Sequence, residues 1–93
     1  MIKSFKDKET EHLWSKGWSK KLPSYIQERA VKKLRLIDAS TTLKDLAFPP
    51  SNNLETLIGD RKGENSIRIN DQYRICFKWI DRDAFDVEIC DYH

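Results

Sequence analysis

The spacing of the apolar residues changes once along the chain, from the period of a helix to that of a strand. Four apolar residues within 23–39 recur every three or four positions, which is the spacing of one helix face. They are Ile26, Ala30, Leu34 and Ile37. After residue 53 the period becomes two, most clearly in residues 73–80, as in strands whose two faces differ. The sequence therefore predicts an α+β fold with its helices in the first half.

Shorter segments complete this pattern. Asp7 is suited to cap a short first helix that Gly17 closes, and residues 2–5 are compatible with a β-strand. Strands are expected at residues 54–58, 66–70, 73–80 and 85–92. The alternating pattern predicts that Phe85, Val87 and Ile89 lie on one face of the last strand. Because short turns join antiparallel strands, we expect two N-terminal helices packed on one face of a small, mainly antiparallel sheet.

The length of the chain, 93 residues, fits a single domain spanning residues 1–93. Three Trp, three Tyr and four Phe supply large apolar surfaces for its core. Apolar runs are only a few residues long, so no membrane span is expected. The opening residues lack the apolar region of a secretory signal, which predicts a cytoplasmic protein. In that compartment Cys76 and Cys90 are expected to be free core residues.

The charge is close to balanced overall, at +2, but it is unevenly distributed. Residues 1–37 carry ten basic and four acidic side chains, whereas residues 38–93 carry seven basic and eleven acidic ones. A cationic first part fits either a solvated helix surface or a surface that binds nucleic acid. The charge alone does not decide between these readings.

Several common chemistries have no counterpart in the sequence. His12 and His93 lie at opposite ends and the two cysteines are far apart, so no metal site is expected. The three glycines form no nucleophile elbow, phosphate-binding loop or dinucleotide fingerprint. Serine hydrolases and nucleotide-fold enzymes are thereby excluded, and no cofactor is expected.

Basic and proton-carrying side chains gather in the last third of the chain. They are Arg68, Arg74 and Lys78 on the expected strands, and Asp91, Tyr92 and His93 at the end. Two guanidinium groups can clamp a phosphate and stabilise the charge of a five-coordinate phosphoryl transition state. An imidazole can move a proton near neutral pH, and a phenol can stack on a base. The alternative is an ordinary surface, since strand arginines often pair with carboxylates and chain ends often fray.

Three stretches of the sequence resemble the HigB toxins of the RelE superfamily. They are residues 54–63 (LETLIGDRKG), residues 66–75 (SIRINDQYRI) and the ending DYH at 91–93. Residues 1–5 and 34–39 also fit, so the resemblance spans the chain. It implies the fold of small microbial ribonucleases and the toxin of a type II toxin–antitoxin pair. Such a toxin is a metal-independent endoribonuclease that cleaves mRNA in the ribosomal A site and inhibits translation and growth.

The resemblance also implies roles for individual residues. The 2′-hydroxyl attacks the adjacent phosphate, with His93 as proton donor or acceptor, Arg74 as phosphate clamp and Arg68 as second charge stabiliser. Asp91 and Tyr92 would orient the substrate or stack on it. Basic side chains would contact RNA of the message or the ribosome, namely Lys20, Lys21, Lys32, Lys33, Arg61 and Lys62.

The sequence departs from some family members at two positions. They carry a histidine where Glu55 stands and a lysine where Ile58 stands. Glu55 is therefore either a general base or a surface residue, and a degenerate toxin with little activity stays an alternative. So does a non-catalytic module that binds protein or nucleic acid. The expected partners are a HigA-like helix-turn-helix antitoxin, the ribosome and mRNA, with operator DNA reached only through the antitoxin.

Overall fold

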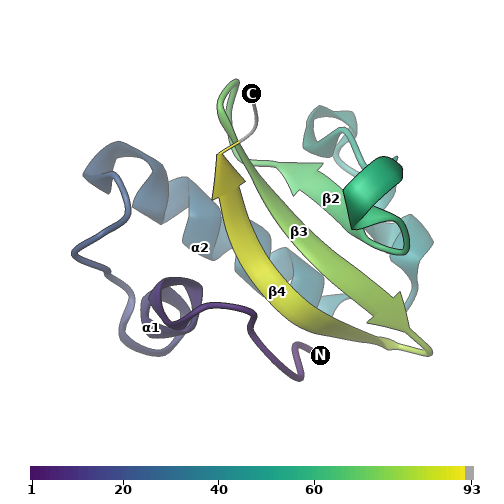
Figure 1. Cartoon of the computed structure of the whole chain (residues 1–93), viewed down its shortest axis with the longest axis horizontal. Helices are drawn as coiled ribbons and strands as arrows, with labels where there is room; N and C mark the ends of the chain where they lie inside the picture. The colour runs from purple at the N-terminus through teal and green to yellow at the C-terminus, as the bar shows by residue number, and fades with distance from the viewer. Residues whose placement is uncertain (92–93) are drawn as a thin grey trace.

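The computed structural model describes residues 1–91, which form a four-stranded sheet with helices packed against one face (Figure 1). The helices are α1 at Lys8–Lys16 and α2 at Ser24–Ala39, and the strands are β1 at Glu55–Thr56, β2 at Asn65–Arg68, β3 at Tyr73–Ile80 and β4 at Asp83–Asp91. Short 3₁₀ helices lie at Leu43–Ala47 (η1), Pro50–Asn52 (η2) and Gly59–Arg61 (η3). The strands pair antiparallel in sequence order. The expected α+β architecture is confirmed.

Both helices form where the local signals place them. The Asp7 carboxylate accepts a hydrogen bond from the amide of Thr10 at 3.1 Å, and Gly17 ends α1 in the left-handed region. In α2 the four apolar residues with helical spacing are all buried, facing the sheet. No helix among the described residues is long and apolar enough to cross a membrane.

The predicted strand bounds agree best with the structure at the centre of the sheet. β3 has the expected bounds, but β1 is shorter than residues 54–58 and β2 ends two residues before Asn70. The side chain of Asn70 accepts hydrogen bonds from the amides of Gln72 and Tyr73, which turns the chain early. Residues 2–5 make only isolated parallel bridges to the edge of β4.

A β-bulge overturns the expected facing of the last strand. Asp86, whose φ is 52°, and Val87 lie together opposite the single residue Phe77. As a result Ala84 and Val87 are both buried in the core between sheet and helices. Phe85 instead pairs with the exposed Lys78. The prediction that Phe85 shares a face with Val87 is therefore wrong.

The core between α2 and the sheet should contribute strongly to the free energy of unfolding. Leu34 is fully buried among apolar side chains of the sheet, so Leu34→Ala should lower the free energy of unfolding by about 2–5 kcal/mol. Urea unfolding followed by circular dichroism measures this. The adjacent Arg35 is exposed, and Arg35→Ala serves as the control, with an expected change below about 0.5 kcal/mol. Equal stabilities for the two variants would contradict this description of the core.

Candidate active site

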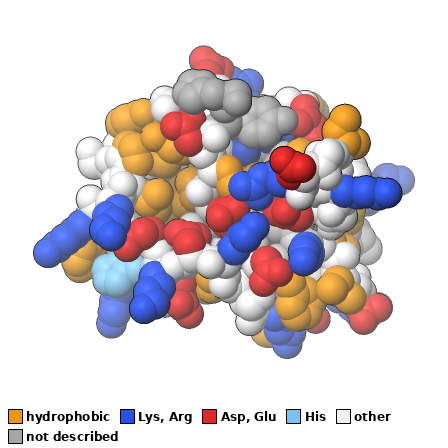
Figure 2. Space-filling view, viewed as in Figure 1, with side chains coloured by type: hydrophobic (Ala, Val, Ile, Leu, Met, Phe, Trp, Pro, Cys, Tyr) orange, Lys and Arg blue, Asp and Glu red, His pale blue; other side chains and the backbone are white. Residues whose placement is uncertain are grey.

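The two arginines expected to bind phosphate lie side by side on the face of the sheet away from α2. Arg68 of β2 is paired with Arg74 of β3, and Arg74 with Cys90 of β4. Directly paired residues point to the same face of a sheet, and their neighbour Ile75 points into the helix-side core. We call the face with the arginines the open face. Figures 1 and 2 view it from the front, and basic and acidic side chains cluster on it.

Arg74 is the most tightly held charged group of the open face. It is only 5% exposed, and its Nε donates a hydrogen bond of 2.8 Å to the hydroxyl of Ser66. Its Nη2 donates to the backbone carbonyl of Asn53 at 2.6 Å. Asn53 has a φ of 46°, a left-handed conformation that asparagine tolerates better than most residues. The guanidinium is thus fixed in one orientation before any ligand arrives.

A carboxylate stands beside this guanidinium. Oε2 of Glu55 lies 3.7 Å from Nη2 of Arg74, and the Glu55 side chain is 42% exposed. Register explains the proximity, because Glu55 of β1 pairs with Ser66, the residue that holds Arg74. The side chain can therefore contact both solvent and a ligand bound at Arg74.

Arg68 is held more loosely than Arg74. Its side chain is 41% exposed and forms an ion pair with Asp71, which is itself almost fully exposed. Exposed pairs of this kind contribute little free energy, so a phosphate can take the place of the Asp71 carboxylate. The open face thus offers one rigid guanidinium and one that can adjust.

The end of β4 lies next to these residues. Asp91 pairs with Tyr73, the residue before Arg74, and its carboxylate accepts a hydrogen bond from Gln72 at 3.1 Å. The positions of Tyr92 and His93, two of the expected catalytic residues, lie outside the described residues.

Further along the open face, two free cysteines pack with Leu57 in a small apolar cluster. A hydrogen bond with Cys76, together with burial, raises the pKa of the Cys90 thiol, which therefore stays protonated at neutral pH. The neighbouring Arg61 contacts the carboxylates of Glu64 and Glu88 at 3.1 and 3.0 Å. Cys76 and Cys90 thus match the expectation of free core residues.

Comparison with known proteins decides the family. The model of a family described as RelE-like toxin of the type II toxin–antitoxin system HigB matches residues 3–93. The chain belongs to this HigB family. Toxin HigB-1 of Vibrio cholerae serotype O1 is 42% identical over 82 residues, covering 87% of this chain and 86% of that protein. Endoribonuclease HigB of Proteus vulgaris is 37% identical over 93 residues, the whole length of both.

Solved structures with the same fold extend the comparison. The YoeB–YefM complex from Staphylococcus aureus contains a chain that aligns with a TM-score of 0.56 at 19% identity, covering 100% of this chain and 98% of that chain. A heterotetrameric YoeB–YefM complex from the same organism aligns with a TM-score of 0.55 at 17% identity, with the same coverage. Such a likeness concerns the fold, which is that of RelE-like toxins.

The basic residues expected to bind RNA occupy three separate places in this HigB-family chain. Lys20 and Lys21 are exposed between α1 and α2, and Lys32 and Lys33 lie on α2. Arg61 and the exposed Lys62 lie at the end of η3. Lys78, which the sequence grouped with the arginines, forms an ion pair with Asp86 at 3.5 Å instead.

The residues that hold Arg74 in place carry no signal in the sequence that points to it. Ser66 and Asn53 are the hydrogen-bond acceptors of Arg74, yet they precede it by 8 and 21 residues. Asn53 follows two prolines, a signal for a turn but not for an arginine partner. Strand register alone brings these groups together.

Proposed function

We propose that this protein is the toxin of a type II toxin–antitoxin pair and acts as an endoribonuclease that cleaves mRNA in the ribosomal A site. The observation that carries the proposal is the buried, immobilised guanidinium of Arg74 beside the exposed Arg68 on one open face. Donors fixed in advance stabilise developing charge better than mobile ones, because they need no reorganisation during the reaction. The relative in Proteus vulgaris, similar over its whole length, is named an endoribonuclease.

The resemblance to the HigB toxins implies the chemistry, and the charges on the open face fit it. Arg74 and Arg68 bind the non-bridging oxygens of the scissile phosphate and stabilise the five-coordinate transition state. A base removes the proton of the 2′-hydroxyl, whose oxygen forms a new bond to phosphorus. The bond from phosphorus to the 5′ oxygen breaks, and His93 donates a proton to that oxygen. The products carry a 2′,3′-cyclic phosphate and a 5′-hydroxyl, while Asp91 and Tyr92 orient the RNA.

Glu55 is the base that the geometry favours. Its carboxylate lies 3.7 Å from Arg74 and so borders the place where the phosphate would bind. We expect Glu55→Gln to lower the cleavage rate by about 10²-fold or more, because the amide cannot accept the proton. Asp60→Asn removes the same charge from an exposed residue of the same surface pocket and should leave the rate unchanged. Equal rates for both variants would make Glu55 a surface residue only.

The second candidate is a degenerate toxin, and one observation favours it. Ile58, which replaces the lysine of some relatives, is 87% exposed and so presents an apolar side chain where a cation would help to bind RNA. A degenerate toxin would bind ribosomes without cleaving the message.

The proposed partners are a HigA-like helix-turn-helix antitoxin, the ribosome and mRNA, with operator DNA contacted through the antitoxin and the protein acting in the cytoplasm. Exposed lysines support the RNA contacts, because each phosphate that they neutralise releases counterions. Assembly of the related-fold YoeB chains with YefM supports an antitoxin partner.

The experiment that tests this function uses two messages that differ at a single position. Each is translated in a bacterial extract with purified protein, and one lacks the 2′-hydroxyl at the mapped cleavage position. We expect cleavage of the normal message, leaving a 2′,3′-cyclic phosphate, and none at the deoxy position. Cleavage of the deoxy message at the same bond would contradict 2′-hydroxyl attack.

A further inference from the structure

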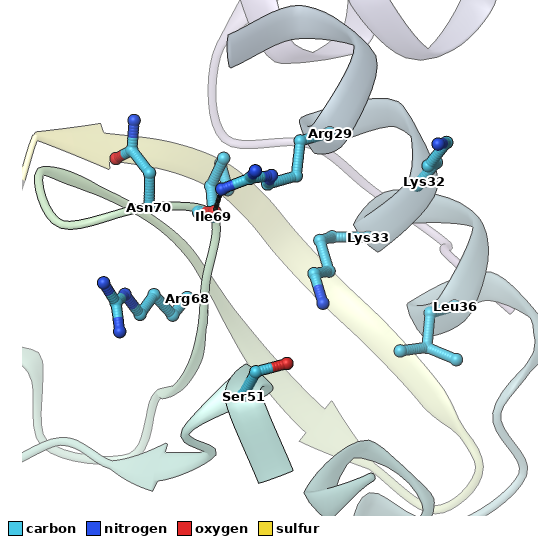
Figure 3. Close-up of a pocket in the computed structure, with 8 residues that line it drawn as sticks. All are labelled: Arg29, Lys32, Lys33, Leu36, Ser51, Arg68, Ile69 and Asn70. Carbon is cyan, nitrogen blue, oxygen red and sulfur yellow. Dashed lines mark hydrogen bonds between the residues drawn. The ribbon is translucent and has the colours of Figure 1, made fainter. Parts of the chain in front are cut away.

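A second concentration of positive charge lies in a cleft between α2 and the end of β2 (Figure 3). Among its lining residues in the described part of the chain, four are basic and none is acidic. The basic residues are Arg29, Lys32, Lys33 and Arg68. We call this the α2 cleft. Arg68 belongs both to it and to the open face, so the two sites adjoin.

Two of these cations form hydrogen bonds to other segments of the fold. Nη1 of Arg29 donates a hydrogen bond to the carbonyl of Ile69 at 3.2 Å, across the cleft from α2. Nζ of Lys33 donates to Oδ1 of Asn52, a fully buried side chain. The amide of Asn52 in turn donates to the carbonyls of Leu46 and Phe48. Figure 3 shows Arg29 and Lys33 reaching from α2 into the cleft.

The placement of these cations is electrostatically unfavourable without an anion. Arg29 and Lys33 are four residues apart on one helix, where like charges repel. Burial, and then the charge of Arg29, lowers the pKa of Lys33. Neither residue forms an ion pair with a carboxylate in residues 1–91. Lys32 and Arg68 do have carboxylate partners, Glu28 and Asp71, but both are highly exposed and such pairs are weak.

We propose that the α2 cleft binds a backbone phosphate of an RNA strand whose neighbouring phosphates lie on the open face. This inference rests on the proposed function and adds a binding site to it. Because Arg68 borders both the α2 cleft and the open face, one RNA strand can reach both sites. Tyr25, one turn before Arg29 on α2, is 70% exposed. An exposed aromatic ring beside fixed cations is typical of surfaces that bind single-stranded nucleic acid, because bases stack on the ring.

The test removes the two charges and keeps polar side chains in their place. In the double variant Arg29→Gln/Lys33→Gln, both positions keep a polar side chain with an N–H donor, and the positive charge is lost. The matched control is Lys3→Gln/Lys16→Gln, which removes the same charge from exposed residues of the N-terminal segment and α1. Thermal unfolding of all proteins is measured first.

Two probes distinguish the source of the phosphate. One is a short RNA methylated at every 2′-oxygen, which cannot be cleaved, and the other is ribosomes free of mRNA. Binding is measured over a series of salt concentrations. We expect the double variant to bind the short RNA about tenfold more weakly, with a slope in log salt shallower by about 0.7 for the one lost single-strand phosphate contact, and the control to bind like wild type. Loss on the short RNA supports one strand of the message that reaches both places. Loss on ribosomes alone would overturn this continuity, because the cleft would then hold ribosomal RNA.

Unchanged affinity and salt slope on both probes would overturn the inference. So would weaker binding of the antitoxin with unchanged binding of both probes, because the cleft would then hold carboxylates of a protein. Cleavage is measured on the same preparations. If wild type cleaves and the double variant binds normally, only the cleft inference fails. If wild type never cleaves, the proposed function fails and the binding data still decide the cleft.

Discussion

Replacing Arg74 by lysine is expected to slow mRNA cleavage by about 10²- to 10³-fold while the fold is kept. The arginine donates to Ser66 and to the Asn53 carbonyl at the same time, and its planar guanidinium has five N–H donors in a fixed arrangement. Lysine carries the charge as a single compact ammonium and cannot hold that orientation. Single-turnover cleavage at saturating protein measures the effect, and circular dichroism and thermal unfolding verify the fold.

The control for Arg74→Lys is the same exchange at an exposed position. Arg82 lies in the turn between β3 and β4, and Arg82→Lys should cleave like wild type. Wild-type cleavage by Arg74→Lys would show that Arg74 acts only in stability. If Arg74→Lys proves unstable, Ser66→Ala removes one acceptor of the same guanidinium and should still slow cleavage.

Replacing His93 by glutamine should slow cleavage by about 10²- to 10⁴-fold, because the proton for the departing 5′ oxygen is lost. The prediction rests on the family resemblance, since His93 lies outside the described residues. A histidine that donates a proton is active only while protonated, so the wild-type rate should fall as pH rises. A pH series of cleavage rates for both proteins measures this, and the step should be absent from the His93→Gln variant.

His12 provides the matched control, because it is the only other histidine of the chain. It lies at the first helix, where its Nδ1 is 2.7 Å from the carbonyl of Trp18. His12→Gln should retain both the rate and the pH dependence. A His93→Gln variant with wild-type rate and an unchanged pH step would mean that another group moves the proton.

Local sequence signals were sufficient to predict the helices and the central strand β3. Asp7 and Gly17 cap α1 through contacts with their near neighbours, and β3 needs only its alternating pattern. The bulge at Asp86 was beyond such signals, since the alternation runs unbroken through it and no glycine, the usual marker of positive φ, stands there. The early end of β2 depends on Asn70, whose side chain hydrogen bonds replace a strand pairing.

The candidate site was predictable in composition but not in geometry. The sequence singled out Arg68 and Arg74 as candidate phosphate-binding groups, and the two residues pair directly in the sheet. It did not reveal that Arg74 is buried, because Ser66 and Asn53 reach it only through strand register. The α2 cleft has the same origin, as Lys33 is positioned by Asn52, 19 residues away. Contacts between distant segments decide which charges are fixed and which stay free to exchange partners.

Primer extension on an mRNA under translation in a bacterial extract tests the central claim most directly. Wild-type protein, Arg74→Lys and a reaction without ribosomes are compared on the same message. The proposed mechanism predicts breaks within codons that require both ribosomes and the arginine. Wild-type protein that binds ribosomes but leaves the message intact would contradict it and indicate a degenerate toxin, and protein that neither binds nor cleaves would indicate a module with a different partner.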